Sequence, residues 1–174
     1  MTDHESSDWT DPTARRADPE GVAKIRELLK DARIAMLTTV SLDGGLVSRP
    51  MATQQVEFDG DAWFFAQADA PKIEELRADP RMNAAYTDGG NYVSLSGTAS
   101  VVRDDAKKRE LWNPFAEAWF QCRPEDPQVV LIRLTPSTAE YWDTPGKASS
   151  LIAMVKGKLT GERPAVGENE VVEL

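Results

Sequence analysis

Three short, mostly apolar runs follow one another in residues 33–67, and an Asp-Gly pair separates each run from the next. These pairs are Asp43-Gly44 and Asp59-Gly60. Tight hairpin turns need a positive φ, which glycine adopts at little cost, so Asp-Gly between apolar runs predicts a hairpin. We therefore predict β-strands over residues 33–41, 46–58 and 61–67.

Apolar residues at helical spacing predict a helix over residues 19–31, with Asp18 as its cap and Pro19 at its first position. A second helix is expected from Pro71 to just before Pro80. An aromatic-rich helix is expected over 105–120, where Pro114 should kink or divide it. A final short helix is predicted over 147–158.

Four further runs predict strands in the second half of the chain. Gly97 is expected to form a bulge or corner, and Pro136 a turn between the last two strands. The predicted strands span residues 82–87, 91–103, 129–134 and 138–142.

These elements predict an α+β fold that is predominantly β and antiparallel. Long successive strands joined by tight turns favour a barrel over an open sheet, because closure removes the exposed edges. We expect a disordered leader over residues 1–17, one domain over 18–160, and a polar, loosely held tail over 161–174.

Composition narrows the possible partners. The 174 residues fit one domain, and the net charge of −9 argues against nucleic acid or an anionic membrane, which both need a basic face. We see neither a transmembrane run nor a signal peptide. A lone cysteine, Cys122, forms no internal disulfide and suits a cytoplasmic protein.

The only histidine, His4, lies in the polar leader. Ser-His-Asp and Cys-His catalysis therefore have no base, and a zinc site built on His and Cys is excluded in practice. No basic partner for Cys122 is apparent, which makes it an incidental thiol. The chemistry must come from carboxylates, Lys, Arg, Tyr or a bound cofactor, and we expect no metal.

Arg49 and Lys72 each stand at the end of a predicted strand region in an otherwise acidic chain. Cations brought together beside a sheet indicate an anion site, although each could also be an ordinary surface residue. The tryptophans fit either core packing or contact with an aromatic ligand.

Seven short motifs occur in a fixed order: Ala35-Met-Leu-Thr-Thr39, Ser48-Arg-Pro-Met51, Trp63-Phe-Phe65 with Lys72 downstream, Ser96-Gly-Thr-Ala99, Leu111-Trp-Asn-Pro114, Ala118-Trp-Phe120 and Ala139-Glu-Tyr-Trp-Asp143. Together they resemble the general stress protein branch of the pyridoxamine 5′-phosphate oxidase-like, FMN-binding split barrels. The resemblance covers roughly residues 20–160.

The resemblance implies a six-stranded antiparallel split β-barrel with flanking helices, assembled as a homodimer with FMN at the subunit interface. It implies cofactor contacts from one strand and the next, a phosphate-binding lysine, and a tryptophan that the partner subunit places near the flavin ring. The contacts from the first strand are Arg49, Pro50, Met51, Ala52 and Thr53, and those from the next strand are Phe65, Ala66 and Gln67. The phosphate-binding lysine is Lys72, and the tryptophan near the partner's flavin ring is Trp142. Trp112 and Trp119 are further candidates to close the pocket.

The chain departs from the vitamin-pathway enzyme at two places. A Ser-Arg-Lys run holds the phosphate there, whereas this chain has Ala70-Pro-Lys72, and the C-terminal Arg and His pattern that grips pyridoxamine phosphate is missing. We therefore do not expect this chain to oxidise pyridoxamine phosphate.

Three hypotheses of function remain. The first is an FMN-dependent oxidoreductase with a small-molecule electron donor or acceptor, such as a nicotinamide nucleotide. The second is a non-catalytic flavin-binding or stress-response protein. The third is a relative that binds a deazaflavin or haem in the same cleft, although haem normally needs an axial histidine.

Overall fold

The computed structural model describes residues 19–54, 58–143 and 168–174. Within them, seven antiparallel strands form one sheet in the order β2-β1-β4-β5-β6-β3, and β7 pairs with β6. The strands are β1 (Ile34–Val40), β2 (Leu46–Ala52), β3 (Ala62–Gln67), β4 (Arg81–Asp88), β5 (Asn91–Val102), β6 (Val129–Asp143) and β7 (Glu168–Glu173). The helices are α1 (Pro19–Leu29), α2 (Pro71–Ala78), α3 (Asp105–Leu111) and α4 (Pro114–Phe120).

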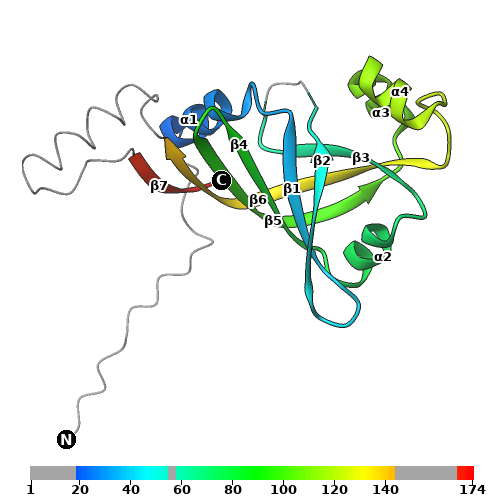
Figure 1. Ribbon diagram of the computed structural model, residues 1–174, viewed down its shortest axis with the longest axis horizontal. Coiled ribbons are helices and arrows are strands. Elements are labelled where there is room, and N and C mark those ends of the chain that lie inside the picture. Colours follow the sequence, from blue (N-terminus) through cyan, green and yellow to red (C-terminus); the bar gives the residue numbers. More distant parts are fainter. Residues whose placement is uncertain (1–18, 55–57, 144–167) are drawn as a thin grey trace, which may run out of the picture.

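The long strand β6 gives the sheet its split form (Figure 1). One edge of β6 pairs with β5 along most of its length. The other edge pairs with β3 over residues 129–134 and with β7 over residues 138–143. Because the path of paired strands ends at β2 and β3, the described part of the sheet is not closed, and this agrees with the predicted split barrel.

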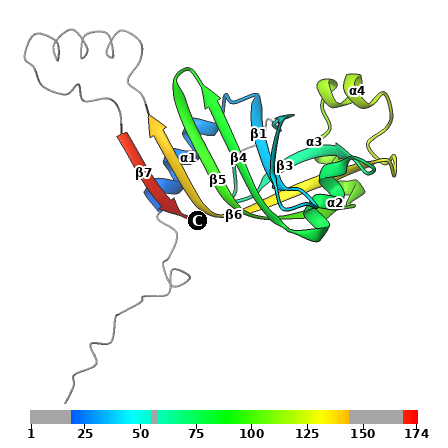
Figure 2. The same cartoon turned by 60° about the horizontal axis from the view of Figure 1, so that its bottom comes forward.

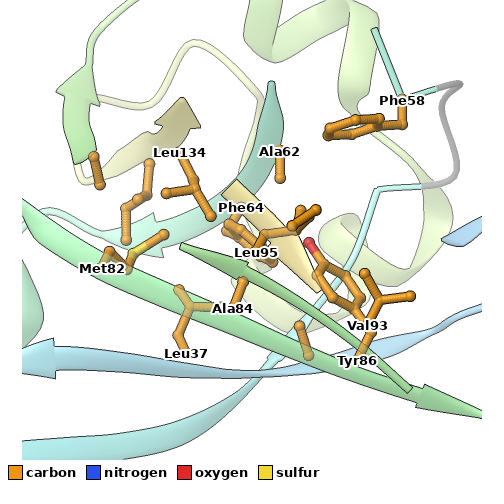
Figure 3. Close-up of a cluster of buried hydrophobic side chains, with 14 of the residues drawn as sticks. Leu37, Phe58, Ala62, Phe64, Met82, Ala84, Tyr86, Val93, Leu95 and Leu134 are labelled. Atoms are coloured by element: carbon orange, nitrogen blue, oxygen red, sulfur yellow. The ribbon is translucent and has the colours of Figure 1, made fainter. Parts of the chain in front are cut away.

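Alternating side chains along the strands build the main core inside the curved sheet. Leu37, Phe64, Leu95 and Leu134 are fully buried there and point toward one another (Figure 3). Helix α1 adds Ile25 and Leu28 to this cluster, and α2 adds Ile73 and Leu76. The apolar periodicity that predicts these two helices therefore marks their buried faces.

A second, smaller core lies on the opposite face of β3 and β6. Neighbouring residues in a strand point to opposite faces, so Phe64 enters the main core while Phe65 enters the second one. There Phe65 packs with Leu111 of α3 and Ala116 of α4. This contact anchors the two helices beside β3.

Gly97 is the bulge in β5. The register between β5 and β6 shifts at Ser96/Gly97, and Gly97 lies opposite Pro136. A Cβ atom on Gly97 would come within 2.2 Å of the Thr135 carbonyl oxygen. The two backbones can approach this closely only because residue 97 has no side chain.

Four sequence expectations need correction. The hairpin predicted at Asp59-Gly60 is wrong, because β2 pairs with β1 whereas β3 pairs with β6 in the described sheet. Strand β2 ends at Ala52 rather than at Phe58, because its partner β1 begins at Ile34, which is paired with Ala52. Residues 129–134 and 138–142 belong to one strand, since Pro136 faces the bulge at Gly97 and does not break β6. The tail is not loose throughout, because residues 168–173 pair with β6 and Val172 is buried.

Other expectations hold in the described residues. The 105–120 segment is divided at Pro114 into α3 and α4, as predicted. The leader over residues 1–17 and the helix predicted over 147–158 lie outside the residues that the structure describes. The domain boundaries therefore stay predictions.

Candidate functional site

A cavity of about 820 Å³ opens between strands β2 and β3 and helices α2 and α4. Figures 1 and 2 show α2 and α4 separated from one another beside β3, and residues of both helices line the cavity. Its lining residues are Arg33, Ile34, Arg49, Pro50, Met51, Ala52, Thr53, Gln54, Phe65, Ala66, Gln67, Ala70, Lys72, Asn113, Pro114, Phe115, Ala116, Trp119 and Phe120.

Nine of the ten cofactor-contact residues expected from sequence line this one cavity: Arg49, Pro50, Met51, Ala52, Thr53, Phe65, Ala66, Gln67 and Lys72. The tenth, Trp142, does not line it and lies near the C-terminal end of β6, opposite Tyr92. The resemblance assigns Trp142 to the partner subunit's site, so that assignment stays a prediction.

The end of the cavity near α2 is cationic. Arg49 Nη1 donates to Thr39 Oγ1 at 2.6 Å, and Arg49 Nη2 donates to Glu75 Oε2 at 2.8 Å. Lys72 lies one helical turn before Glu75 on α2. Burial, and then repulsion by Arg49, lower the pKa of Lys72, while Glu75 acts in the opposite direction. An anion bound here would relieve the repulsion between the two cations.

The end of the cavity near α4 is aromatic. Phe115 and Trp119 stack with their ring centroids 6.3 Å apart and an interplanar angle of 13°. They are 60% and 71% exposed, although both line the cavity. A planar apolar ligand could cover part of this exposed surface.

Asn113 fixes helix α4 beside the cavity. Its Oδ1 accepts a hydrogen bond from the Ala116 N–H at 2.9 Å, which caps the helix, and its Nδ2 donates to Gln54 Oε1 at 2.9 Å. The first bond satisfies an N–H group that has no partner within the helix. The second bond ties α4 to the segment that follows β2.

Trp112 and Trp119, both expected to close the pocket, have different positions. Trp119 lines the cavity. Trp112 is not among the lining residues, and its ring packs edge-on against Phe65, with centroids 5.2 Å apart. Trp112 therefore supports the cavity wall through the second core.

The structure adds lining residues that the sequence reasoning missed, among them Gln54, Asn113 and Phe115. Asn113-Pro114 carries a readable signal, since Asn followed by Pro is a typical helix start. Thr39 belongs to the first of the seven motifs, but the sequence did not link it to Arg49, and Glu75 gave no signal. Only the packing of α2 on β1 brings them to the same place.

Side-chain nucleophiles and metals find little support in the described residues. Burial, and then the nearby Asp126 carboxylate, raise the pKa of Cys122, which disfavours its reactive thiolate. No cluster of three or more His, Cys, Asp or Glu residues suited to a metal occurs among the described residues. None of the described helices is long and apolar enough to span a membrane.

One face of the sheet, opposite the main core, exposes large apolar side chains. Pairing across β1, β4, β5, β6 and β7 places Met36 and Val171 in one row, and Tyr92 and Trp142 in the next. All four are exposed. We call these four residues the outer apolar face.

Comparisons with known proteins show which family this chain resembles. Residues 20–165 match the family model described as pyridoxamine 5′-phosphate oxidase like. The chain is 32% identical over 149 residues to protein bli-3 of Neurospora crassa, covering 78% of this chain and 71% of that protein.

Two solved structures are also similar. A general stress protein 26 from Jannaschia sp. CCS1 is 28% identical, with a TM-score of 0.76, covering 90% of this chain and all of that one. A general stress family protein from Xanthomonas campestris pv. campestris is 33% identical, with a TM-score of 0.63, covering 76% of this chain and 93% of that one.

Proposed function

This chain belongs to the pyridoxamine 5′-phosphate oxidase like family, and we propose that it is a flavoprotein that binds FMN in the cavity between α2 and α4. One observation carries the proposal: a single cavity joins a cationic end, at Arg49 and Lys72, to an aromatic end, at Phe115 and Trp119. FMN has the matching pair of ends, a phosphate and a flat ring system.

The cationic end suits the phosphate. A guanidinium and an ammonium donate charge-assisted hydrogen bonds, which are shorter and stronger than bonds between neutral groups. Arg49 and Lys72 are both only partly exposed, so solvent screens their charges less than on an open surface. A phosphate with two negative charges would attract the two cations more strongly than the single negative charge of Glu75 does.

The rest of the cavity suits the ring and the sugar chain. Its volume of about 820 Å³ lies within the range of small-molecule sites. Met51, Ala52 and Phe65 line it with apolar groups, and Gln67 and Thr53 add polar ones. This mixture is typical of cofactor sites, where a few polar groups orient a mainly apolar ligand.

We further propose a homodimer that uses the outer apolar face. Tyr92, Trp142 and Val171 lie exposed on the neighbouring strands β5, β6 and β7. Met36 is exposed on the same face, in the row of Val171, with Ala85, Ser94 and Glu140 between them. Exposed apolar patches commonly mark interaction surfaces, and a second copy of the same chain is the commonest partner. In such a dimer, Trp142 would approach the partner's flavin.

The proposed activity is oxidation–reduction with a small-molecule electron donor or acceptor. A bound flavin supplies the redox chemistry itself, and the protein binds and orients it. Arg49 and Lys72 would hold the phosphate, and α4 would limit access of water at the other end. Pyridoxamine phosphate is not proposed as the substrate, because the Arg and His pattern that grips it in the vitamin-pathway enzyme is missing.

The second candidate function is non-catalytic flavin binding, in a stress-response role. The observation that favours it is the description of two similar structures as general stress proteins. Both candidates share the same cavity and cofactor. They differ only in whether the flavin turns over.

The test begins with the absorption spectrum of the purified protein, which distinguishes FMN from a deazaflavin or haem. Fluorescence titration with FMN and with riboflavin then measures the contribution of the phosphate. We expect FMN to bind at least tenfold more tightly, and equal affinities would contradict the proposal. NADH or NADPH oxidation with a generic acceptor, normalised to bound flavin, separates the enzyme from the non-catalytic protein.

A further inference from the structure

Thr39 and Glu75 are buried polar side chains that stand behind the cavity and are not among the residues that line it. Thr39, on β1, is 1% exposed, and Glu75, on α2, is 7% exposed. Burying a carboxylate costs free energy unless it is paired and hydrogen-bonded. The group that pairs with Glu75 is Arg49, which lines the cavity.

The three side chains close a triangle of hydrogen bonds. The Thr39 hydroxyl donates to Glu75 Oε2 at 2.5 Å, and it accepts from Arg49 Nη1 at 2.6 Å. Arg49 Nη2 donates to the same Glu75 oxygen at 2.8 Å. The triangle therefore links β1, β2 and α2 at one point.

This triangle fixes the orientation of the guanidinium. Its contacts to Thr39 and Glu75 use two of the five N–H groups that an arginine offers. Both terminal nitrogens are held, so rotation about the last side-chain bonds is restricted. Because Arg49 also lines the cavity, the N–H groups that these two bonds do not use are within the part of the side chain that a bound ligand could contact.

We propose that Thr39 and Glu75 are positioning residues for Arg49, which hold its guanidinium ready for the phosphate group of the ligand. This inference rests on the proposed function. Thr39 is the central member, because its single hydroxyl contacts both charged groups. Without that hydroxyl, the guanidinium loses one of its two anchors and must be ordered when the phosphate binds.

The alternative is a purely structural role, in which the triangle only holds β1, β2 and α2 together. In that case, loss of the Thr39 hydroxyl would lower stability and affect all flavins alike. A positioning role instead concerns only ligands that carry the phosphate, and it acts only through Arg49. These two differences define the experiment.

The test replaces Thr39 by Val, which keeps the shape and removes the hydroxyl, and by Ser, which keeps the hydroxyl. FMN and riboflavin are titrated by flavin fluorescence against both variants and against Thr39→Val combined with Arg49→Ala. Thermal unfolding checks that each variant folds. Thr39→Ala, which also lacks the hydroxyl, is the second variant should Val not fit.

We expect Thr39→Val to weaken FMN binding about tenfold, as for a lost hydrogen bond to a charged group, and to leave riboflavin binding within about twofold. Thr39→Ser should retain FMN affinity. In the Arg49→Ala background, Thr39→Val should cause no further loss. Unchanged FMN affinity in a folded Thr39→Val variant, equal losses for both flavins, or a full further loss without Arg49 would overturn the inference.

Failure of the proposed function gives a different result. If the unmodified protein binds FMN no better than riboflavin, inorganic phosphate becomes the probe and the shift in unfolding temperature becomes the measurement. A phosphate shift in the unmodified protein that is reduced in Thr39→Val would support the positioning role. Equal shifts, or no shift in either protein, would overturn it.

Discussion

At the scale of single residues, the site depends on two cations that an acidic chain brings together. The chain carries a net charge of −9, so its average field repels a phosphate. Arg49 and Lys72 reverse that field locally, and Glu75 keeps their mutual repulsion tolerable while the cavity holds no anion.

Arg49→Ala should weaken FMN binding by tenfold or more, because a charge-assisted hydrogen bond contributes about 1.5–3 kcal/mol. Riboflavin, which lacks the phosphate, should bind nearly as it does to the unmodified protein. Fluorescence titration of both flavins measures this. Arg77→Ala, which removes an exposed cation from α2, is the matched control, and an equal loss there would point to general charge rather than to Arg49.

Lys72 should make FMN binding sensitive to alkaline pH. Burial and Arg49 lower its pKa below the ordinary 10.5, so the ammonium loses its proton at a lower pH than an exposed lysine does. The phosphate is already fully ionised above about pH 7.5. FMN affinity should therefore fall as pH rises above 7.5, and the fall should begin at a lower pH than an ordinary lysine would give. Lys72→Arg, which stays charged, should remove that fall.

At the scale of elements, one local feature positions the cavity wall and another shapes the sheet. Asn113 positions α4, whose exposed aromatic pair forms one end of the cavity. Gly97 lets β5 and β6 approach where the edge of β6 changes partner from β3 to β7. Asn113 acts at the start of a helix, and Gly97 acts where two paired strands come close together.

Asn113→Ala should cost about 1 kcal/mol of stability, as for a lost helix cap, and should also free α4 from Gln54. Gln54→Ala leaves the hydrogen bond from the Ala116 N–H to Asn113 intact and removes the partner of Asn113 Nδ2. It should retain most of the stability while it weakens the tether. Chemical denaturation measures the first effect. Quenching of tryptophan fluorescence by acrylamide measures the second, and because the chain has five tryptophans, the contribution of Trp119 is obtained by comparison with Trp119→Phe.

Gly97→Ala should destabilise the protein by about 1–3 kcal/mol or more, as overpacking does. The added Cβ would meet the Thr135 carbonyl oxygen at 2.2 Å and the Pro136 Cα at 2.5 Å. Backbone atoms cannot move aside as a flexible side chain can. Gly45→Ala, whose nearest neighbours are side-chain oxygens at 3.2 and 3.3 Å, should be milder, and a similar loss of melting temperature for both variants would contradict this reasoning.

At the scale of the whole molecule, the outer apolar face stands apart from the two cores. The main core and the second core bury their residues within one chain. Tyr92, Trp142 and the two residues in the neighbouring row stay exposed in the single chain. A dimer would cover them, and it would also bring two cavities into one assembly.

Light scattering should show a dimer at micromolar concentration, and Tyr92→Arg should shift it toward the monomer. A charge placed within an apolar interface loses its hydration without gaining a partner. Ala78→Arg adds the same charge to α2, which packs on the core side of the sheet, and should leave the dimer intact. A flavin-bound monomer of the unmodified protein would contradict a site shared between subunits.

Local sequence patterns determined most of the elements and much of the site. Asp43-Gly44 and Pro114 mark their turn and helix break directly, because each depends on the backbone preference of its own residues. Seven motifs in order indicated the family, and residues of four of them, together with Lys72, lie around the cavity. These signals are local, so no tertiary contact is needed to read them.

Tertiary structure alone decided the rest. Strand β2 ends where β1 runs out, β6 continues through Pro136 because Gly97 makes room, and residues 168–173 become a strand because the edge of β6 is open to them. Likewise, Thr39 meets Arg49 through the pairing of β1 with β2, and Glu75 joins them only when α2 packs on β1. Pairing partners and buried contacts between distant segments carry no local signal, and so the groups that orient Arg49 could not be found before the chain was folded.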